Sequence, residues 1–373
     1  MLDEIAYLIL YISIFVQLFF ALFIFSRILF HNKNNAPSKT ITGISVIIAC
    51  RNEEENLPKL LDVLRNQSYP SFEVIIANDR STDQSKTLLE EACLLDNRFK
   101  FINIEETLSG IHPKKYALSQ ATAQAQFETL LFTDADCLPG ENWILEIAES
   151  YSPNTEIVLG YSPYQKTDSL KINSLLNLFI RHETFYTGIQ YLSFALTGMP
   201  YMAVGRNLSY KKSVFERNGG YGKHKQVSGG DDDLFVNQQA TRTNTNIVIN
   251  KESQVISVPE TTWKGWFWQK TRHLSVGKHY KNRDIALLGI LNLSHICFYL
   301  ALGHLWLTQA ESLVLFKFYT LRFIPLCFVF GLIKKKLSDN FNIYLFPVTD
   351  FLYLCYYIVI GVASIFIKRI KWK

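Results

Sequence analysis

The 373-residue sequence has only six cysteines, and none of them is paired at the spacing of a zinc site or a redox motif. We interpret them as reduced thiols in a cytoplasmic and membrane setting, not as a disulfide framework. The chain also lacks a tract of Lys and Arg with interleaved aromatic residues, which excludes nucleic acid as an expected partner. Its net charge of +5 is explained by basic flanks that face anionic lipid headgroups.

Charge is missing from long stretches at both ends of the sequence. Ile5–Ser26 and Ile285–Ala310 contain no Asp, Glu, Lys or Arg. Each is longer than the roughly 20 residues that cross a bilayer core. Phe351–Ile367 is also uncharged and borderline in length, whereas Leu313–Ile333 is interrupted by two basic residues. The sequence therefore predicts membrane segments on both sides of a polar middle, with Leu313–Ile333 the weakest of them.

The N-terminal stretch, within residues 1–30, is interpreted as a membrane anchor and not as a cleaved signal peptide. Acidic residues precede it instead of a basic region, and no small-residue cleavage site follows. Basic residues come after it, namely Arg27, Lys33 and Lys39. This charge distribution predicts that the following domain lies on the cytoplasmic side of the membrane.

The C-terminal membrane region, residues 284–370, allows two or three crossings. Three crossings from a cytoplasmic domain leave the basic tail, residues 368–373, outside, against the positive-inside rule. Two crossings place it inside, with the remaining segment re-entrant or lying in the interface. We favour two full crossings.

Residues 43–282 read as a single α/β domain between the membrane segments. Short apolar or β-branched runs are predicted as strands, at Ile44–Cys50, Phe72–Ala77, Lys100–Ile104 and Thr129–Thr133. Helical patterns separate them, the first with Asn52 as its predicted N-cap. Strands that alternate with helices predict a parallel sheet wound as in nucleotide-binding folds.

Two carboxylates, Asp134 and Asp136, follow the fourth predicted strand at i and i+2. In an extended chain these side chains point to the same face, and ligands of open α/β sheets bind outside the carboxyl ends of the strands. Mg²⁺ typically takes one or two carboxylates and completes its shell with substrate phosphates. The pair therefore suits a divalent metal that holds a diphosphate, and Cys137 beside it is interpreted as a packing residue.

Three consecutive acids, Asp231, Asp232 and Asp233, follow Gly229 and Gly230. Mutual repulsion tends to raise the pKa of one of them, which suits a general base. The alternative is a solvated loop in which Asp231 caps a helix.

Several segments in this order resemble the family 2 glycosyltransferases, which have the GT-A fold. The resemblance runs from about Ile44 to Tyr280. It is carried by Ile47–Glu54, Asn78–Asp83, Asp134–Asp136, Gly205–Phe215 and Gly219–Tyr221. It implies a GT-A nucleotide-diphospho-sugar transferase fold, that is, a Rossmann-like mixed sheet, with transmembrane helices at both ends.

The resemblance also implies site residues. The first strand end, with Ala49, Arg51 and Glu53, and Asp79 after the second strand would hold the base and ribose of the donor. Lys114 stands at a basic position of the family's pattern, and Asp134 and Asp136 would contact ribose and a Mg²⁺ or Mn²⁺ ion. The implied base is Asp231, with Asp232 as the alternative.

Membrane-embedded members carry Gln-x-x-Arg-Trp before their C-terminal spans, which here is Gln269, Arg272 and His273. The resemblance implies that Gln269 and Arg272 contact the donor diphosphate, while the lost Trp counts against a processive polymerase. The aromatic run 266–268 is interpreted as an interfacial belt. Residues 173–201 are interpreted as a helix pair near the membrane that shapes the acceptor site.

Together these features favour an inverting, metal-dependent glycosyltransferase of the hexosyl type in the cytoplasmic membrane, spanning it several times, with its catalytic domain in the cytoplasm. Its expected donor is a nucleotide sugar, most commonly a UDP-sugar in this family. Its expected acceptor is a membrane lipid or lipid-linked saccharide of the cell envelope. The alternatives are a processive polysaccharide synthase and a non-catalytic scaffold that retains the fold.

Overall fold

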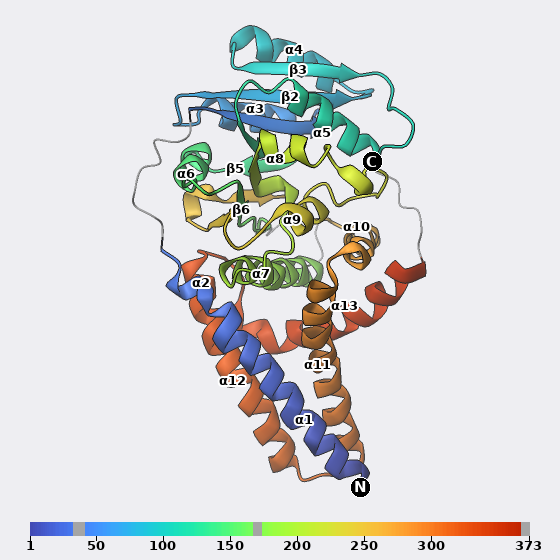
Figure 1. Ribbon diagram of the computed structural model, residues 1–373. Helices are drawn as coiled ribbons and strands as arrows, with labels where there is room; N and C mark the ends of the chain where they lie inside the picture. The colour runs from blue at the N-terminus through green and yellow to red at the C-terminus, as the bar shows by residue number, and fades with distance from the viewer. Residues whose placement is uncertain (33–41, 167–173, 367–373) are drawn as a thin grey trace.

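The computed structural model describes residues 1–32, 42–166 and 174–366. An α/β domain lies at one end, and long helices extend from it at the other (Figure 1). Lys33, Lys39 and the basic tail 368–373, on which the membrane orientation was partly predicted, lie outside the described residues.

The domain is built on a seven-stranded mixed sheet in the order β3-β2-β1-β4-β7-β6-β8. β7 runs antiparallel to both of its neighbours, and the other pairs are parallel. The strands are β1 Ile44–Cys50, β2 Phe72–Asp79, β3 Phe99–Ile104, β4 Thr129–Phe132, β6 Ile157–Gly160, β7 Leu208–Lys211 and β8 Thr245–Val248. A second sheet pairs β5 Cys137–Pro139 with β9 Val255–Ser257. The predicted mixed α/β sheet is confirmed.

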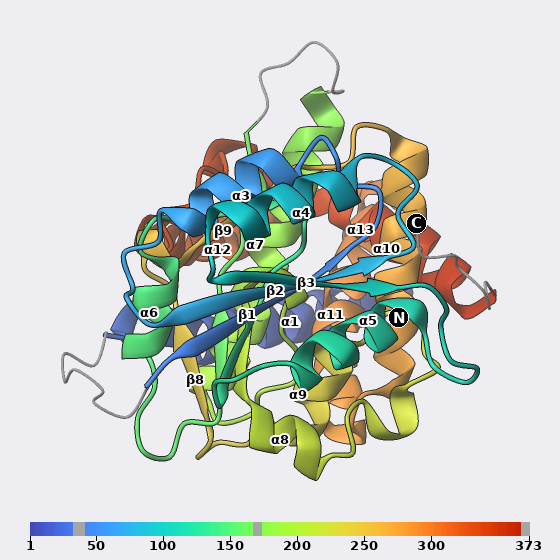
Figure 2. The same cartoon turned by 90° about the horizontal axis from the view of Figure 1, so that it is seen from above.

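Helices cover both faces of the sheet, with α3 and α4 on one side and α5 on the other (Figure 2). The helices of the domain are α3 Leu57–Arg65, α4 Ser85–Leu95, α5 Pro113–Ala123, α6 Trp143–Glu149, α8 Lys212–Arg217 and α9 Asp233–Gln239. The short 3-10 turns are Gly205–Asn207, Gly222–His224, Lys251–Ser253, Gly277–His279 and Ile343–Leu345. In α3 the leucines at helical spacing are all buried, which is why this amphipathic segment docks against the sheet.

The prediction that Asn52 caps α3 is wrong. The helix starts at Leu57 after Asn56, and Asn52 itself has a φ of 53°. Its side-chain oxygen accepts a hydrogen bond of 2.8 Å from the backbone N–H of Thr82. Asn tolerates this left-handed conformation, so the residue joins the loop after β1 to the loop after β2 and does not start a helix.

The segment interpreted as a helix pair is one continuous helix, α7 Ser174–Leu196. Its charged residues do not break it, because they find partners: Arg181 donates to the backbone carbonyl of Asn340, and Glu183 pairs with Lys270. Pro200 lies beyond its end. The helix runs across the molecule between the sheet domain and the long helices (Figure 1).

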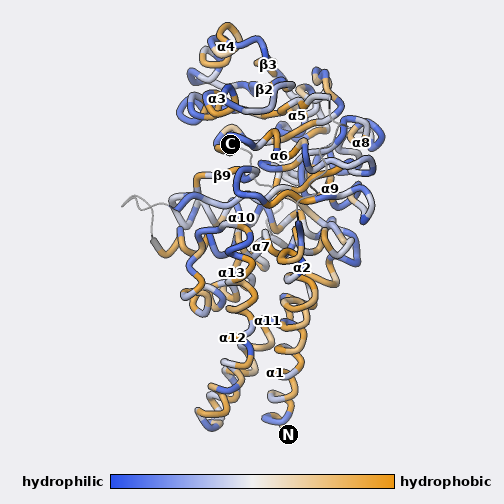
Figure 3. Tube along the Cα trace, turned by 90° about the vertical axis from the view of Figure 1, so that its left-hand side faces the viewer, coloured by the Kyte–Doolittle hydropathy of each residue, from blue (hydrophilic) through white to orange (hydrophobic). Residues whose placement is uncertain are grey.

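Within the described ranges 1–32, 42–166 and 174–366, four helical segments are long and apolar enough to cross a membrane. The first comprises α1 Leu2–Phe19, a π-helical stretch Phe20–Phe25 and α2 Arg27–Phe30, and the others are α11 Asn282–Leu307, α12 Ser312–Lys336 and α13 Phe346–Phe366. α1, α11 and α12 form a bundle, whereas α13 runs across below α7 (Figure 1). Apolar residues dominate along the bundle (Figure 3). α10 Trp263–Val276 leads from the domain into α11.

Candidate functional site

A cavity of about 900 Å³ lies beyond the ends of β1 and β4. Most of the residues predicted for the site line it, although they come from five different parts of the chain. They are Ala49, Arg51, Glu53, Lys114, Asp134, Asp136, Asp231, Asp232, Gln269 and Arg272. Asp79 is not among the lining residues. It is buried at the end of β2, where Arg80 pairs with its carboxylate at 2.8 Å, so its contact with a donor stays a prediction.

The carboxylates Asp134 and Asp136 follow β4, as expected, and a ligand atom of each lies within 4.8 Å of the other and of the Cys137 thiol. Lys114 of α5 donates to the Oδ1 atom of Asp134 at 2.9 Å. Burial raises the pKa of Cys137, so the thiol stays neutral. Its Sγ atom lies 3.0 Å from the hydroxyl oxygen of Ser257. The carboxylate oxygens of the pair fit Mg²⁺ or Mn²⁺, which prefer oxygen ligands to a thiol, and the packing role of Cys137 stays a prediction.

The acidic loop folds so that each aspartate has a different environment. Gly229 and Gly230 have φ values of 83° and 72°, which a residue with a side chain adopts only with strain. The Asp231 carboxylate pairs with Lys114 at 3.1 Å. Asp232 accepts from the backbone N–H of Gly205 at 2.6 Å and of Asp233 at 2.7 Å. The cap of α9 is therefore Asp232, and the alternative that Asp231 caps this helix is wrong.

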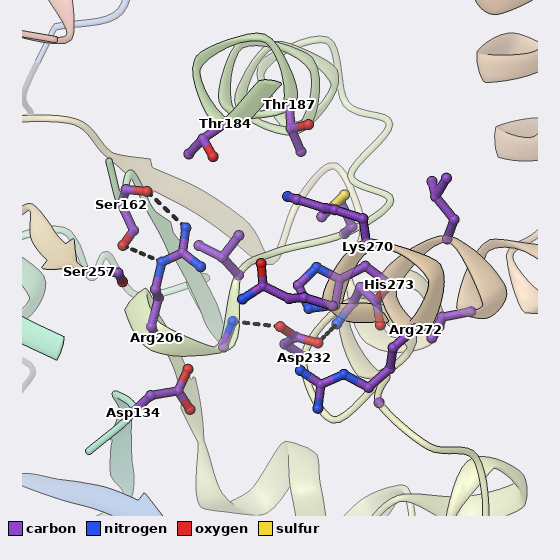
Figure 4. Close-up of a pocket in the computed structure, with 18 of the residues that line it drawn as sticks. Asp134, Ser162, Thr184, Thr187, Arg206, Asp232, Ser257, Lys270, Arg272 and His273 are labelled. Carbon is purple, nitrogen blue, oxygen red and sulfur yellow. Dashed lines mark hydrogen bonds between the residues drawn. The ribbon is translucent and has the colours of Figure 1, made fainter. Parts of the chain in front are cut away.

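α10 brings the predicted Gln269 and Arg272 to the cavity. Figure 4 shows Asp232 at the centre, Asp134 on one side, Lys270, Arg272 and His273 on another, and Thr184 and Thr187 of α7 opposite Asp134. The interpretation of residues 266–268 as an interfacial belt does not hold for Trp266. This side chain is buried against Phe179 and Tyr356, with ring centroids 5.4 Å away in both cases.

Comparison with known proteins agrees with this geometry. Residues 45–219 match the model of glycosyl transferase family 2. This segment of the chain is therefore similar to glycosyl transferase family 2. The matched residues include the strand ends and both carboxylates of the Asp134–Asp136 pair, while the acidic loop and α10 lie beyond them.

Related proteins match this chain over part of their length. The chain is 29% identical over 117 residues to a poly-beta-1,6-N-acetyl-D-glucosamine synthase of Staphylococcus epidermidis. The aligned residues make up 31% of this chain and 27% of that protein. It is 30% identical over 117 residues to the putative glycosyltransferase EpsH of Bacillus subtilis. That alignment covers 31% of this chain and 33% of EpsH. The chain thus spans about a third or less of the length of these curated relatives.

The fold also has a solved counterpart. A mannosyltransferase from Pyrobaculum calidifontis, determined in complex with GDP-Man and Mn²⁺, superposes with a TM-score of 0.62 at 18% identity. The match covers 91% of this chain and 99% of that one. At this identity the likeness establishes the shared GT-A fold.

Sequence reasoning assigned no role to Arg206, although the segment that carries it was recognised. Its guanidinium lines the cavity, donates to the hydroxyl of Ser162 at 2.7 Å and to its carbonyl at 3.1 Å, and lies 4.8 Å from the ring centre of Tyr164. Lys115, next to the predicted Lys114, was also missed. It is buried and donates to the carbonyls of His224 and Val227, so it fixes the loop that precedes the acids.

The neighbouring aspartates of the acidic loop differ in pKa. Burial acts to raise the pKa of Asp231, but Lys114 and Lys115 outweigh it and lower the value to about 2. Burial and the charge of Asp231 raise the pKa of Asp232. Asp231 therefore stays ionised at neutral pH beside a cation, and the raised pKa that the sequence led us to expect of the base falls on Asp232 instead.

The low pKa of Asp231 predicts that its ion pair stabilises the protein only above acid pH. Because the folded value lies below the ordinary aspartate value of about 3.9, this stabilisation is present at neutral pH and is lost as the pH falls from about 5 towards 2. We expect the thermal unfolding midpoint of Lys114→Met to fall less steeply over this range than that of the unmodified protein. Lys59→Met, which removes an exposed lysine of α3, is the control. Equal slopes for Lys114→Met and the unmodified protein would contradict the assignment.

Proposed function

We propose that the protein is an inverting, metal-dependent glycosyltransferase. It moves a sugar, of the hexosyl type, from a nucleoside-diphosphate sugar to a membrane lipid or lipid-linked saccharide of the cell envelope. The observation that carries this proposal is the single cavity in which the Asp134–Asp136 pair, the acidic loop and the Gln269–Arg272 pair of α10 meet.

The donor would bind along the ends of the first strands. Ala49, Arg51 and Glu53 line the cavity where β1 ends and are the proposed contacts of the nucleoside. Asp79 is proposed to complete them from β2. A UDP-sugar is the donor that the resemblance implies, and the solved mannosyltransferase holds GDP-Man. Whether the donor carries uracil or guanine is therefore decided by comparing UDP-sugars with GDP-sugars.

Asp134 and Asp136 would hold Mg²⁺ or Mn²⁺ at the donor diphosphate. A divalent ion there neutralises the charge that builds on the leaving diphosphate, which contributes several kcal/mol to the transition state. Lys114 lies between Asp134 and Asp231, at 2.9 and 3.1 Å, and so fixes the distance between the metal pair and the acidic loop. Arg272 can contact the same diphosphate through two N–H groups.

Asp231 is the proposed base. The two oxygens of Asp232 are each engaged by a backbone N–H, whereas Asp231 is held by a lysine side chain. In the reaction an acceptor hydroxyl oxygen forms a bond to the anomeric carbon, and the bond from that carbon to the diphosphate oxygen breaks. The hydroxyl proton passes to the Asp231 carboxylate, and the nucleoside diphosphate leaves. Attack opposite the leaving group inverts the anomeric centre.

The helical segments suggest how the enzyme sits in the membrane. We propose an anchor at residues 1–30, a cytoplasmic domain at 43–282 and a membrane region at 284–370 in the cytoplasmic membrane. α11 and α12 would be the two full C-terminal crossings, and α13 would lie along the membrane surface. The course of α13 below α7 supports this topology (Figure 1).

A processive polysaccharide synthase is the second candidate, because one relative is a poly-beta-1,6-N-acetyl-D-glucosamine synthase. Two observations favour a single transfer. His273 stands where the resemblance expects Trp, and the bundle interior is filled by buried side chains such as Leu10, Phe298 and Arg322. A non-catalytic scaffold is the remaining alternative, and the retained carboxylates argue against it.

The test is nucleoside diphosphate release by detergent-purified protein from a panel of UDP- and GDP-sugars, with membrane lipid extract and with Mg²⁺ or Mn²⁺. We expect release from one donor, loss of release on chelation, and an effect of Asp136→Ala of about 100-fold, as the loss of a metal ligand implies. Glu141→Ala, at an exposed acid nearby, is the control and should keep full activity. Donor binding without release from any donor would favour the scaffold.

A further inference from the structure

The cavity of the active site continues beyond the catalytic residues onto α11. Ile285, Leu288, Gly289 and Asn292 all line it. Their spacing of i, i+3, i+4 and i+7 places them on one face of the helix. Because α11 is one of the candidate membrane spans, this face joins the catalytic cavity to a membrane helix.

α13 supplies the other side of this extension. Tyr353, Tyr356 and Tyr357 line the same cavity, and the hydroxyl of Tyr353 donates to that of Tyr357 at 3.3 Å. Tyrosine combines an apolar ring with a polar end and suits the boundary between lipid and water. α13 runs across the molecule here, while α11 descends into the bundle (Figure 1).

The lining changes in character along the cavity. Between the acids and α7 it is polar, with Arg206 on one side, and with Thr184, Thr187 and the ion pair of Lys270 with Glu183 on the side of α7 (Figure 4). On α11 the lining is apolar at Ile285, Leu288 and Gly289, with the polar Asn292 one turn further, and on α13 it is aromatic. A ligand that fits both parts has a polar headgroup and an apolar chain.

We propose that the acceptor lipid enters sideways between α11 and α13, with its apolar chain on the Gly289 face and its headgroup at the acids. This route rests on the proposed function and adds the path of the substrate. A soluble saccharide acceptor needs no such passage. The polar stretch of α7 around Thr187 then contacts the headgroup, and the α13 tyrosines contact the first part of the chain.

Gly289 allows a direct test. A Cβ atom at this residue meets no other atom within 4 Å, so a larger side chain fits the backbone and projects from the cavity face. Gly303 offers a matched control on the same helix. A Cβ atom there also meets nothing within 4 Å, but the residue does not line the cavity and lies about 21 Å further along the helix axis.

The experiment compares Gly289→Phe with Gly303→Phe in proteoliposomes. Nucleoside diphosphate release is measured from the donor that the unmodified protein accepts, with and without membrane lipid extract. We expect Gly289→Phe to reduce the lipid-stimulated rate at least about tenfold, the scale of a misplaced substrate. Its slow release without lipid extract, with water as the acceptor, should stay unchanged. Gly303→Phe should keep both rates.

Full lipid-stimulated release by Gly289→Phe overturns the route but leaves the glycosyltransferase proposal standing. If Gly289→Phe loses both rates, a second pair of variants is compared by the same two rates. Ile285→Trp changes the cavity face one turn earlier on α11, and Leu300→Trp is its control at an exposed residue away from the cavity. Failure of the unmodified protein to release nucleotide from any donor overturns the proposed function and the route with it.

Discussion

Asp231→Asn is expected to lower kcat by about 10²–10⁴-fold, the contribution of a positioned general base. The substitution keeps the size of the side chain but removes the carboxylate that would take the acceptor proton. Donor affinity should change little, because the base acts on the acceptor. The measurement is the steady-state rate of nucleoside diphosphate release with lipid extract, together with the donor KM.

Asp232→Asn is the matched comparison, one residue along the same loop. Its carboxylate accepts from two backbone N–H groups at 2.6 and 2.7 Å, one of them at the start of α9. Weakening these charge-assisted bonds should reduce the free energy of unfolding by about 1–3 kcal/mol. The effect on kcat should be smaller than that of Asp231→Asn. The opposite ranking of the two kcat values would assign the base to Asp232.

Arg322→Ala is expected to reduce the free energy of unfolding by about 3–5 kcal/mol, because it leaves a buried carboxylate without its partner. Arg322 of α12 is 1% exposed and pairs with Asp350 of α13 at 2.7 Å. It also donates to Gln17 of α1 at 2.7 Å and lies 3.0 Å from a ring nitrogen of His295 of α11. One side chain thus joins all four candidate membrane segments.

A double variant separates the ion pair from the rest of the packing. Replacing a buried pair by apolar residues of similar volume is often neutral or stabilising. Arg322→Met combined with Asp350→Leu should therefore recover most of the stability that Arg322→Ala loses. Thermal unfolding in detergent gives the ranking. Lys317→Ala, at an exposed position of the same helix, should leave the midpoint unchanged. A double variant as unstable as Arg322→Ala would show that the charges themselves are required.

The parts of the fold that depend on local pattern could be predicted. The β-branched run before Cys50 and the leucines of α3 define buried surfaces by their spacing, and the structure places them in the core. Asp134 and Asp136 were placed correctly because they directly follow a buried strand. In contrast, Asn52 was wrongly predicted to cap a helix. Its actual role depends on a hydrogen bond from Thr82, a residue 30 positions later, which a local pattern does not show.

The charged residues of the long helices show the same limit. Arg322 weakened the prediction of a membrane segment, yet it is buried in α12 beside Asp350, 28 residues away. Glu183 suggested a break in the helical pattern, but Lys270 of α10 neutralises it within a continuous α7. A charge interrupts an apolar pattern only when it has no partner, and partners this distant do not appear in a local window.

The sequence alone therefore determined the α/β class and the parallel strands β1 to β4, the carboxylates at the edge of their sheet and the apolar segments at both ends. These follow from the spacing of neighbouring residues, which sets the face of each strand or helix that is buried. Only the tertiary structure decided that Arg206 joins the cavity, that Lys114 links Asp134 to Asp231, and that one face of α11 continues the site. These contacts join elements far apart in the chain, and they form only when the packing of helices on the sheet brings those elements together.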